Sequence, residues 1–442
     1  MSIARETALR VLVACRRNGA WADAALREQL RRAALGTADA ALCSRIVYGV
    51  VQNERLLDWY LGAFCSQRLD RLQPPLLEIL RMGAYQILYL DKVPDSAAVN
   101  EAVELARGAH RASAAGLVNA VLRNLSRSKS ALPALPTEPV ERLTIQYSCP
   151  AWLVRRLIGI LGVEEAERFL AASNSGAPLT VQVNPLRSDA ESLAAELRAN
   201  GVSVTPHGWL PGCLELAGSG DLTTLHPFLT GKLLVQDAAA ALVAVVSGAK
   251  PGMRVLDVCA APGGKSFSLA FAMRDEGSIL ACDLHENKLV RIREGAQRLG
   301  LRCIETRAAD GRMPDEAQRG QYDLVVCDVP CSGLGILRKK PDVRNKDEAS
   351  LRALPTIQRA ILEASAECVK PGGTLIYSTC TILPEENEAV TDAFLAGNRE
   401  FSYEPFSLPQ PVGDTPGHLT LWPQRHGTDG FYLAKMRRKQ HD

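Results

Sequence analysis

The spacing of apolar residues over the first 130 positions is typical of amphipathic helices. Apolar residues recur at intervals of three and four in two stretches: Leu76, Ile79, Leu80, Gly83, Ala84 and Ile87, and Leu117, Val118, Val121, Leu122 and Leu125. Each set falls on one face of an α-helix. No strand-like alternation interrupts them. We therefore predict an all-α helical bundle of five to seven helices over residues 1–130.

Three prolines follow this segment, Pro133, Pro136 and Pro139, and their spacing predicts a linker. The pattern then changes. It predicts helices over 151–161, 163–173 and 188–200, and short strands over 179–183, 202–204 and 213–216. The mixture indicates a small α+β domain over residues 141–235.

From residue 236 onward, short apolar runs alternate with helical stretches. The runs fall at 255–258, 278–282, 324–327 and 374–377, with helical patterns over 285–299 and 349–368. Such alternation predicts βαβ units and a mostly parallel, doubly wound sheet. We expect a Rossmann-like α/β domain over residues 236–442. Ligands of such sheets bind at the carboxyl ends of the strands, so residues after each run are candidates for chemistry.

Composition narrows the class of protein. With 442 residues, 47% hydrophobic and 23% charged, the chain has the composition of a multidomain globular protein and not of a disordered one. No apolar run is long enough for a membrane span, and the first residues lack the apolar region of a secretory signal. Twelve cysteines without a C-x-x-C pair, and seven histidines without ligand spacing, predict no metal site and a reducing cytoplasm.

Charge is unevenly distributed along the chain. Residues 1–130 carry 18 Lys and Arg against 12 Asp and Glu, although the whole chain has a net charge of only +2. Nearly all of these basic residues are arginine. The excess indicates a polyanionic partner, or else an ordinary solvated helix surface, and charge alone does not separate the two.

The first strand of the Rossmann-like domain is followed by a glycine-rich turn, Cys259-Ala260-Ala261-Pro262-Gly263-Gly264-Lys265-Ser266. A turn of this kind between a strand and a helix lets a ligand approach the backbone closely. It is neither a Walker A loop nor a G-x-G-x-x-G fingerprint. It either binds a nucleotide-like cofactor or only reverses the chain.

Two acids follow the next strands. Asp283 ends the second strand about 20 residues after the glycine turn, a position that suits hydrogen bonds from ribose hydroxyls, or alternatively the capping of the next helix. Asp310, followed by Gly311, accepts either from the exocyclic amine of an adenine or from its own turn.

Two further strands end in cysteine-containing segments, Asp328-Val329-Pro330-Cys331-Ser332-Gly333 and Ser378-Thr379-Cys380. Most of the cysteines are small buried hydrophobes on this interpretation. Two thiols and a carboxyl group at the ligand edge suit methylation of pyrimidine carbon 5. That atom becomes nucleophilic once a thiolate adds to carbon 6. A carboxylic acid at N3 stabilises the charge that develops on the ring, and a base removes the carbon 5 proton.

These motifs resemble those of the RNA cytosine-C5 methyltransferases of the Sun/Nol1/Nop2 family. The resemblance covers roughly residues 145–440. It rests on 259–265, 328–333 and 378–380, together with Val235-Gln236-Asp237, Glu385-Glu386-Asn387 and Thr428-Asp429-Gly430-Phe431-Tyr432. Residues 1–130 resemble NusB, an all-helical RNA-binding domain. The combination implies methylation of one cytosine in small-subunit (16S) ribosomal RNA by a monomeric enzyme.

The family also implies roles for the residues. Cys380 would be the nucleophile, Cys331 would assist product release, and Asp328 would hold the N3 edge of the cytosine. Spacing alone leaves the order of the two cysteines open. The implied cofactor is S-adenosyl-L-methionine, bound by Cys259, Ala260, Ala261, Pro262, Gly263, Gly264, Lys265, Asp283, Asp310 and Asp328.

A basic run, Arg338, Lys339, Lys340, Arg344 and Lys346, follows the Pro-Cys motif. We expect it to neutralise RNA phosphates, the alternative being a solvated loop. The basic tail Lys435, Arg437, Arg438 and Lys439 is equally open to either interpretation. The family usually carries an aromatic residue within the stretch occupied here by Val343–Lys346. Two other functions remain open: a transfer RNA cytosine methyltransferase, and an RNA-binding assembly factor that uses only the NusB-like domain.

Overall fold

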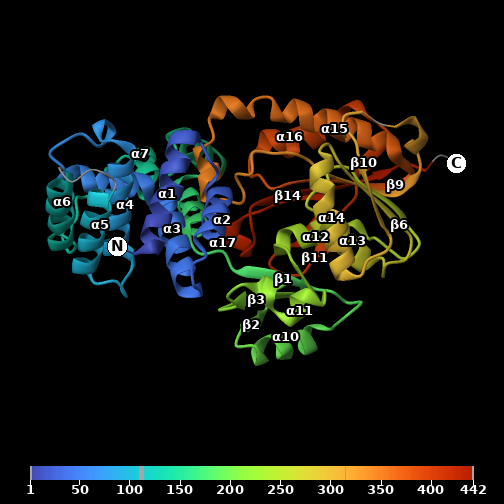
Figure 1. Cartoon of the computed structure of the whole chain (residues 1–442). Helices are drawn as coiled ribbons and strands as arrows, with labels where there is room; N and C mark the ends of the chain where they lie inside the picture. The colour runs from blue at the N-terminus through green and yellow to red at the C-terminus, as the bar shows by residue number, and fades with distance from the viewer. Residues whose placement is uncertain (1, 109–113, 314, 441–442) are drawn as a thin grey trace. The chain divides into compact units, whose positions relative to one another are not determined.

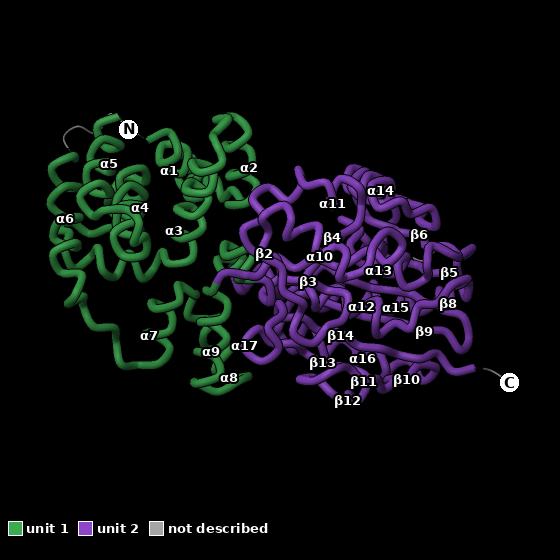
Figure 2. Tube along the Cα trace, turned by 90° about the horizontal axis from the view of Figure 1, so that it is seen from below, with its two compact units in different colours: residues 1–175, 337–346 green, residues 176–336, 347–442 purple. Residues whose placement is uncertain are grey.

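The computed structural model describes residues 2–108, 114–313 and 315–440. The backbone divides into two compact units (Figure 2). Unit 1 contains Met1–Ser175 together with Leu337–Lys346, and unit 2 contains Gly176–Ile336 together with Asp347–Asp442. The division into domains over 1–130, 141–235 and 236–442 stays a prediction, because compact units and domains of common descent need not coincide.

Unit 1 is all-helical within its described residues. Its first part contains α1 (Ile3–Asn18), α2 (Ala22–Ala33), α3 (Thr37–Phe64), the short 3₁₀ helix Leu69–Arg71, α4 (Pro74–Tyr89), α5 (Asp95–Gly108) and α6 (Ala115–Arg127). The predicted stripes of α4 and α6 are buried in one core. Gly83 lets these two helices approach, since a Cβ there would lie 2.4 Å from Leu122 Cδ1. The predicted helical bundle is confirmed.

The proline-rich stretch contains no helix or strand over residues 131–138. Pro139, however, begins α7 (Pro139–Gln146), and the Glu138 carboxylate accepts hydrogen bonds at its N-terminus. Proline suits the first turn of a helix because its missing N–H would have no partner there. α8 (Ala151–Leu161) and α9 (Val163–Asn174) follow as predicted, and α7 packs against α3. The expected linker is therefore short.

The basic segment Leu337–Lys346 is part of unit 1, with a 3₁₀ helix at Pro341–Asn345. Arg344 is buried, and its guanidinium donates to the carbonyls of Pro341, Gln52 and Tyr147 and to Asn174 Oδ1, at 2.7–3.3 Å. The expectation that Arg344 contacts RNA phosphates is thus wrong. Its guanidinium N–H groups instead supply the hydrogen bonds that buried backbone carbonyls need.

We expect Arg344→Met to lower the free energy of unfolding by about 2–4 kcal/mol, because it leaves several buried acceptors without donors. Urea denaturation would measure it. Arg359→Met is the control: this exposed arginine pairs with Glu363 one helical turn away, and such pairs contribute about 0–1 kcal/mol. A stable variant whose RNA affinity had lost salt dependence would instead restore the phosphate interpretation.

The first part of unit 2 is a small antiparallel sheet. Its strands are β1 (Leu179–Val183), β2 (Ser203–Pro206), β3 (Cys213–Ala217) and β4 (Leu233–Val235), in the order β2-β3-β1-β4. α10 (Ala190–Ala199) packs on one face of it (Figure 1), and the 3₁₀ helix Leu222–Thr224 and α11 (His226–Leu229) precede β4. The sequence pattern predicted β1, β2 and β3 to within two residues but did not predict β4.

The second part of unit 2 is built on a large mixed sheet of order β10-β14-β9-β8-β5-β6-β7. Five neighbouring strands are parallel: β5 (Arg254–Asp257), β6 (Ser278–Asp283), β7 (Ile304–Ala308), β8 (Tyr322–Asp328) and β9 (Val369–Thr379). β14 (Phe431–Arg438), β10 (Phe401–Tyr403) and β13 (His418–Leu421) extend it antiparallel. A separate hairpin pairs β11 (Phe406–Leu408) with β12 (Gly413–Thr415).

Helices cover both faces of this sheet. α12 (Ala238–Ser247), α13 (Gly264–Ala272) and α14 (Glu286–Leu299) share one core with it, and α15 (Leu354–Cys368) and α16 (Glu388–Gly397) share the other. Shorter helices lie in the connections: Glu316–Gln318, Glu348–Leu351, Pro384–Glu386 and α17 (Pro423–His426). The Rossmann-like α/β prediction is confirmed. Among the described residues, no helix has the length and apolar character needed to cross a membrane.

Candidate active site

The candidate site lies where the strand order of the large sheet reverses. β5 pairs with β6 on one side and with β8 on the other, so the connections leaving β5 and β8 diverge to opposite sides of the sheet. Open α/β sheets bind ligands outside the carboxyl ends of the strands at such a point. The glycine-rich turn follows β5, and Asp328 ends β8. The sequence motifs therefore meet at the position that the topology favours.

The glycine-rich turn brings its backbone close to other groups. Gly263 has φ +110°, a backbone conformation that residues other than glycine rarely adopt. A Cβ there would lie 2.5 Å from the Phe267 ring. A Cβ on Gly264 would lie 3.2 Å from Gln236 Nε2. α13 begins at Gly264, so the N–H groups of its first turn lie beside the turn. Both glycines are needed for this geometry.

Asp257, the last residue of β5, was not among the sequence-predicted site residues. It is fully buried, and Ser266 Oγ donates to its Oδ2 at 2.7 Å. Its Oδ1 is buried without a hydrogen-bond partner in the described part of the chain. Burial raises the pKa of this carboxyl to about 7. The available signal was an acid at the end of a buried strand, directly before the glycine-rich turn.

Asp283 is buried at the end of β6, and its Oδ1 accepts from His285 N–H at 3.0 Å. Lys288 Nζ lies 3.5 Å from the same oxygen. The capping geometry anticipated from the sequence is therefore present. An ionised carboxylate has about four acceptor positions, so capping leaves room for ribose hydroxyls.

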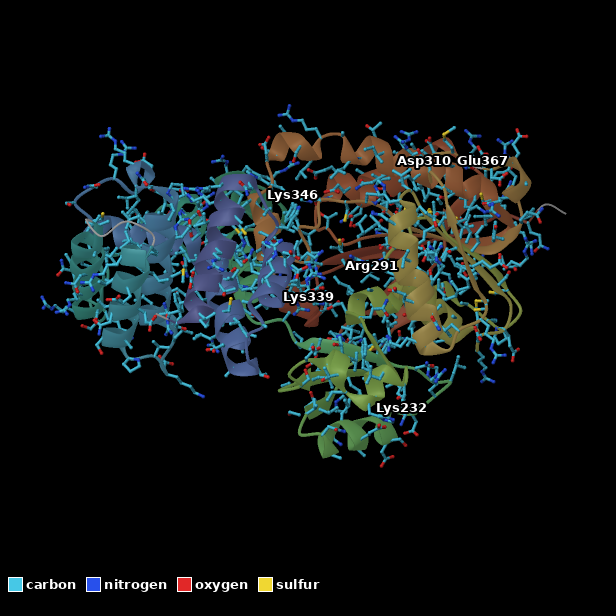
Figure 3. The ribbon with its side chains drawn as sticks, viewed as in Figure 1. Lys232, Arg291, Asp310, Lys339, Lys346 and Glu367 are labelled. Carbon is cyan, nitrogen blue, oxygen red and sulfur yellow. The ribbon has the colours of Figure 1, made fainter. Side chains whose placement is uncertain are left out.

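Asp310 is held by Arg312. The guanidinium pairs with both carboxylate oxygens, and Arg312 N–H donates to Oδ1 at 3.0 Å. These bonds lower the pKa of Asp310 to about 2. Asp310, labelled in Figure 3, lines a cavity of about 220 Å³ with Val258 and residues of α15 such as Ser365. Asp310 therefore caps its own turn, as one of the two interpretations expected. It also borders the cavity.

The two cysteines of the strand-end motifs lie together. Cys331 Sγ is 3.2 Å from Cys380 Sγ, as their positions after the adjacent parallel strands β8 and β9 predicted. Asp328 lies on the same side: its Oδ2 accepts from Lys265 Nζ at 2.5 Å and its Oδ1 from Ser378 Oγ at 2.8 Å. The Lys265 ammonium also lies 5.3 Å from the centre of the Phe431 ring, within range of a cation–π contact.

The surroundings shift the pKa values of the two thiols in opposite directions. The pKa of Cys380 is lowered, chiefly because its thiolate accepts a hydrogen bond from Cys331, with Lys265 adding an electrostatic contribution. The pKa of Cys331 is raised by that same bond and by burial, with further contributions from Glu386 and Asp328. Cys380 is the more readily ionised thiol, and ionised thiols are the nucleophiles of enzymes.

The other basic residues differ in their exposure and in their partners. Lys340 is exposed, whereas Lys346, labelled in Figure 3, lies 6.0 Å from the centre of the Trp21 ring. In the tail, Lys435 and Arg437 pair with Glu404, and Arg438 pairs with Glu400. Lys435, Arg437 and Arg438 therefore form ion pairs within unit 2. No group of three potential metal ligands occurs among the residues that the structure describes.

The sheet and its cofactor loop define unit 2 as the core of an S-adenosylmethionine-dependent methyltransferase. Comparisons with known proteins agree. Residues 244–437 match the family described as 16S rRNA methyltransferase RsmB/F, residues 149–223 match the RsmF/B-like ferredoxin-like domain, and residues 2–127 match the NusB family. The crystal structure of PH0851 superposes with a TM-score of 0.81 at 29% identity and covers 98% of both chains.

Relatives of known name extend this result over the full length. The probable ribosomal RNA small subunit methyltransferase B of Synechocystis sp. is 36% identical, covering 99% of this chain and 100% of the relative. The corresponding protein of Bacillus subtilis is 35% identical, covering 98% of each. The chain therefore belongs to the ribosomal RNA small subunit methyltransferase B family.

Proposed function

We propose that this protein methylates carbon 5 of a cytosine in 16S ribosomal RNA through a covalent adduct on Cys380. The observation that carries the proposal is the 3.2 Å contact between Cys331 and Cys380 beside the Asp328–Lys265 ion pair. Paired thiols next to a carboxylate suit ring activation at a pyrimidine. Methyl transfer to an exocyclic nitrogen or a ribose hydroxyl needs neither thiol. The RNA substrate is inferred from the names of the relatives.

The proposed sequence of events uses each group once. The Cys380 thiolate adds to carbon 6, forming an S–C bond and giving carbon 5 the electron density of an enolate. Asp328 holds the N3 edge of the cytosine, and the Lys265 ammonium beside it balances the charge that develops on the ring. After methyl transfer a base takes the proton from carbon 5, the electrons of that C–H bond re-form the C5–C6 double bond, and the S–C6 bond breaks to return the Cys380 thiolate. Cys331 assists this elimination.

The cofactor site of this proposal is formed by residues 259–265, Asp283 and Asp310, which lie at or just after the carboxyl ends of the neighbouring parallel strands β5, β6 and β7. Bound S-adenosylmethionine supplies an electrophilic methyl group. The residues fit it: two glycines allow backbone approach, and the buried Oδ1 of Asp257, at the end of β5, has no hydrogen-bond partner among the described residues. Asp283 has acceptor positions left for ribose hydroxyls. Asp310, despite its Arg312 partner, still borders the 220 Å³ cavity, whose lining combines apolar side chains such as Leu256 and Val258 with polar ones such as Arg307.

Replacing Asp283 by alanine is expected to weaken S-adenosylmethionine binding by about 1–3 kcal/mol, the cost of leaving buried hydroxyls without an acceptor. Isothermal titration calorimetry measures this directly. Asp275→Ala serves as control, because Asp275 accepts backbone N–H groups of Arg302 and Cys303 at the opposite end of the strands. Unchanged affinity in the Asp283 variant would leave this residue only its helix-capping role.

The proposed function is tested with RNA carrying tritium at cytosine carbon 5. Methylation at carbon 5 releases tritium to water in step with methyl transfer, whereas methylation of any other atom retains it. Deproteinised 16S rRNA, assembled small subunits and transfer RNA form the three arms. Methyl transfer without tritium release overturns the carbon 5 assignment, and activity on transfer RNA alone favours the other substrate.

The three predicted domains receive roles within this proposal. Residues 1–130 and 141–235 bind the RNA, and residues 236–442 carry the chemistry. The helical domain favours ribosomal RNA over transfer RNA as the substrate. An assembly factor without activity is disfavoured by the contact between the cysteines, because a scaffold has no use for two adjacent thiols at a ligand cleft.

A further inference from the structure

Glu386 is a buried carboxylate to which the mechanism above gives no role. It ends the short helix Pro384–Glu386, and its side chain is only 1% exposed. Its Oε2 accepts from Ser332 N–H and from Gln358 Nε2, both at 2.8 Å. Gln358, on α15, is itself completely buried. Its other oxygen, Oε1, accepts a longer bond from Thr381 Oγ1 at 3.4 Å. A buried carboxylate is costly to maintain, so its position calls for a reason.

The partners of this pair flank Cys331 on both sides. Gln358 Nε2 donates to the carbonyl of Pro330 at 3.0 Å, and Glu386 accepts from the N–H of Ser332. The peptide groups before and after the cysteine are thus both fixed by the Glu386–Gln358 pair. Ser332 Oγ lies 2.6 Å from Thr381 Oγ1, which links this loop to the residue after Cys380.

The two cysteines differ in what else holds them. Cys380 directly follows β9, in which Ser378 pairs with both β8 and β14 and Thr379 pairs with β14. Cys331 lies in a loop without helix or strand, between Asp328 and the 3₁₀ helix at Pro341. Removing the Glu386–Gln358 pair therefore frees both peptide groups beside Cys331, whereas on the Cys380 side it removes only the 3.4 Å bond from Thr381 Oγ1 to Glu386 and leaves Cys380 at the end of its strand.

We propose that Glu386, together with Gln358, is a positioning residue that holds Cys331 in place for product release. This inference rests on the proposed function, in which Cys380 attacks and Cys331 assists elimination. Glu386 touches neither the RNA nor the cofactor in this proposal. It acts through the backbone on either side of Cys331, so its loss impairs the second half of the reaction more than the first.

The test measures turnover and covalent protein–RNA complex in parallel. Glu386→Ala and Gln358→Met are each incubated with S-adenosylmethionine and labelled 16S rRNA, and the complex is resolved on a denaturing gel. We expect turnover to fall at least tenfold while the fraction of enzyme in the complex rises severalfold, although Cys331 is intact. Glu386→Gln, whose amide oxygen still accepts from Ser332, should be partly rescued.

Controls separate positioning from folding. Glu363→Gln, also on α15, removes a carboxylate that pairs with the exposed Arg359, and should leave both readouts unchanged. Cofactor affinity by calorimetry reports whether each variant is folded. The double variant Glu386→Ala/Gln358→Met should be no worse than either single variant, since both act on the same loop.

The outcomes are distinct. A variant that loses turnover and complex in equal proportion, while Cys331→Ala accumulates complex, overturns the role of Glu386 but leaves the proposed function standing. If Cys331→Ala itself accumulates no complex, the proposed function fails and this inference fails with it. Should Glu386→Ala not fold, Gln358→Met alone decides, because methionine fills the volume of glutamine without its amide donor.

Discussion

Cys380→Ser is expected to abolish methyl transfer and covalent complex together, whereas Cys331→Ala is expected to trap the complex. A serine hydroxyl is far less ionised than a thiol at neutral pH, and Cys380 in addition has its pKa lowered by the Cys331 hydrogen bond and Lys265. Without the thiolate, carbon 5 of cytosine is not activated. Without Cys331, attack proceeds but elimination is impaired, so the enzyme stalls on its methylated product.

A denaturing gel with labelled RNA separates these two results. Cys331→Ala should give a retarded band, and Cys380→Ser none. The double variant should also give none, since Cys380 acts first. Cys303→Ala is the matched control, because this buried thiol at the start of β7 lies away from the cleft. The reverse pattern, with complex trapped in the Cys380 variant, would falsify the assigned order.

The parts of the fold that sequence pattern predicted are those fixed by local periodicity. The stripe from Leu76 to Ile87 is buried as predicted, because helical spacing alone decides which face packs. The β-branched runs at 255–258 and 324–327 are central strands, since only strands of a parallel sheet are buried on both faces. The adjacency of Cys331 and Cys380 followed from the same rule.

The features missed depend on contacts between distant parts of the chain. Arg344 belongs to a basic run typical of an RNA-binding loop, and only the folded chain brings Gln52, Tyr147 and Asn174 to it. Its burial follows from those partners and not from its neighbours in sequence. The sequence likewise does not show which arginines of residues 1–130 are internal: Arg81 is buried and pairs with Glu78, Glu54 and Asp58.

In the candidate site, too, the residues predicted from local pattern differ from those whose role depends on distant contacts. Motif spacing identified residues that follow strands, such as Asp283 and Cys380. It gave no role to Glu386, although the Glu-Glu-Asn motif was noted, because its bonds to Ser332 and Gln358 span 54 and 28 residues. Asp257 was missed for a different reason. The sequence pattern placed it inside the run 255–258, so it was counted with the strand; in the fold it is the last residue of β5, and Ser266 Oγ donates to its carboxylate.

Asp328→Asn should give the second largest loss, with two readouts that move in opposite directions. The substitution removes the negative charge beside Lys265 and weakens the hold on the N3 edge of the cytosine. Loss of such electrostatic stabilisation lowers the methylation rate by about 10²–10⁴-fold. Asp328 also raises the pKa of Cys380 electrostatically, whereas Lys265 lowers it. With Asp328 neutral, one of the contributions that raise the pKa of Cys380 is removed, although burial and Asp429 still raise it, so this pKa falls further.

The Asp328 variant should therefore alkylate faster at Cys380 while methylating more slowly. The measurement is the pH dependence of iodoacetamide labelling at Cys380, read by peptide mass spectrometry, alongside tritium release from cytosine. Asp323→Asn is the control on the same strand, since Asp323 pairs with Lys370 away from the cleft. Near-normal methylation would show that Asp328 does not bind the N3 edge of the cytosine. A loss of both labelling and methylation would indicate that the substitution disrupts the structure of the site. Because a merely damaged cleft slows both reactions, only the electrostatic role of Asp328 accounts for the two rates diverging.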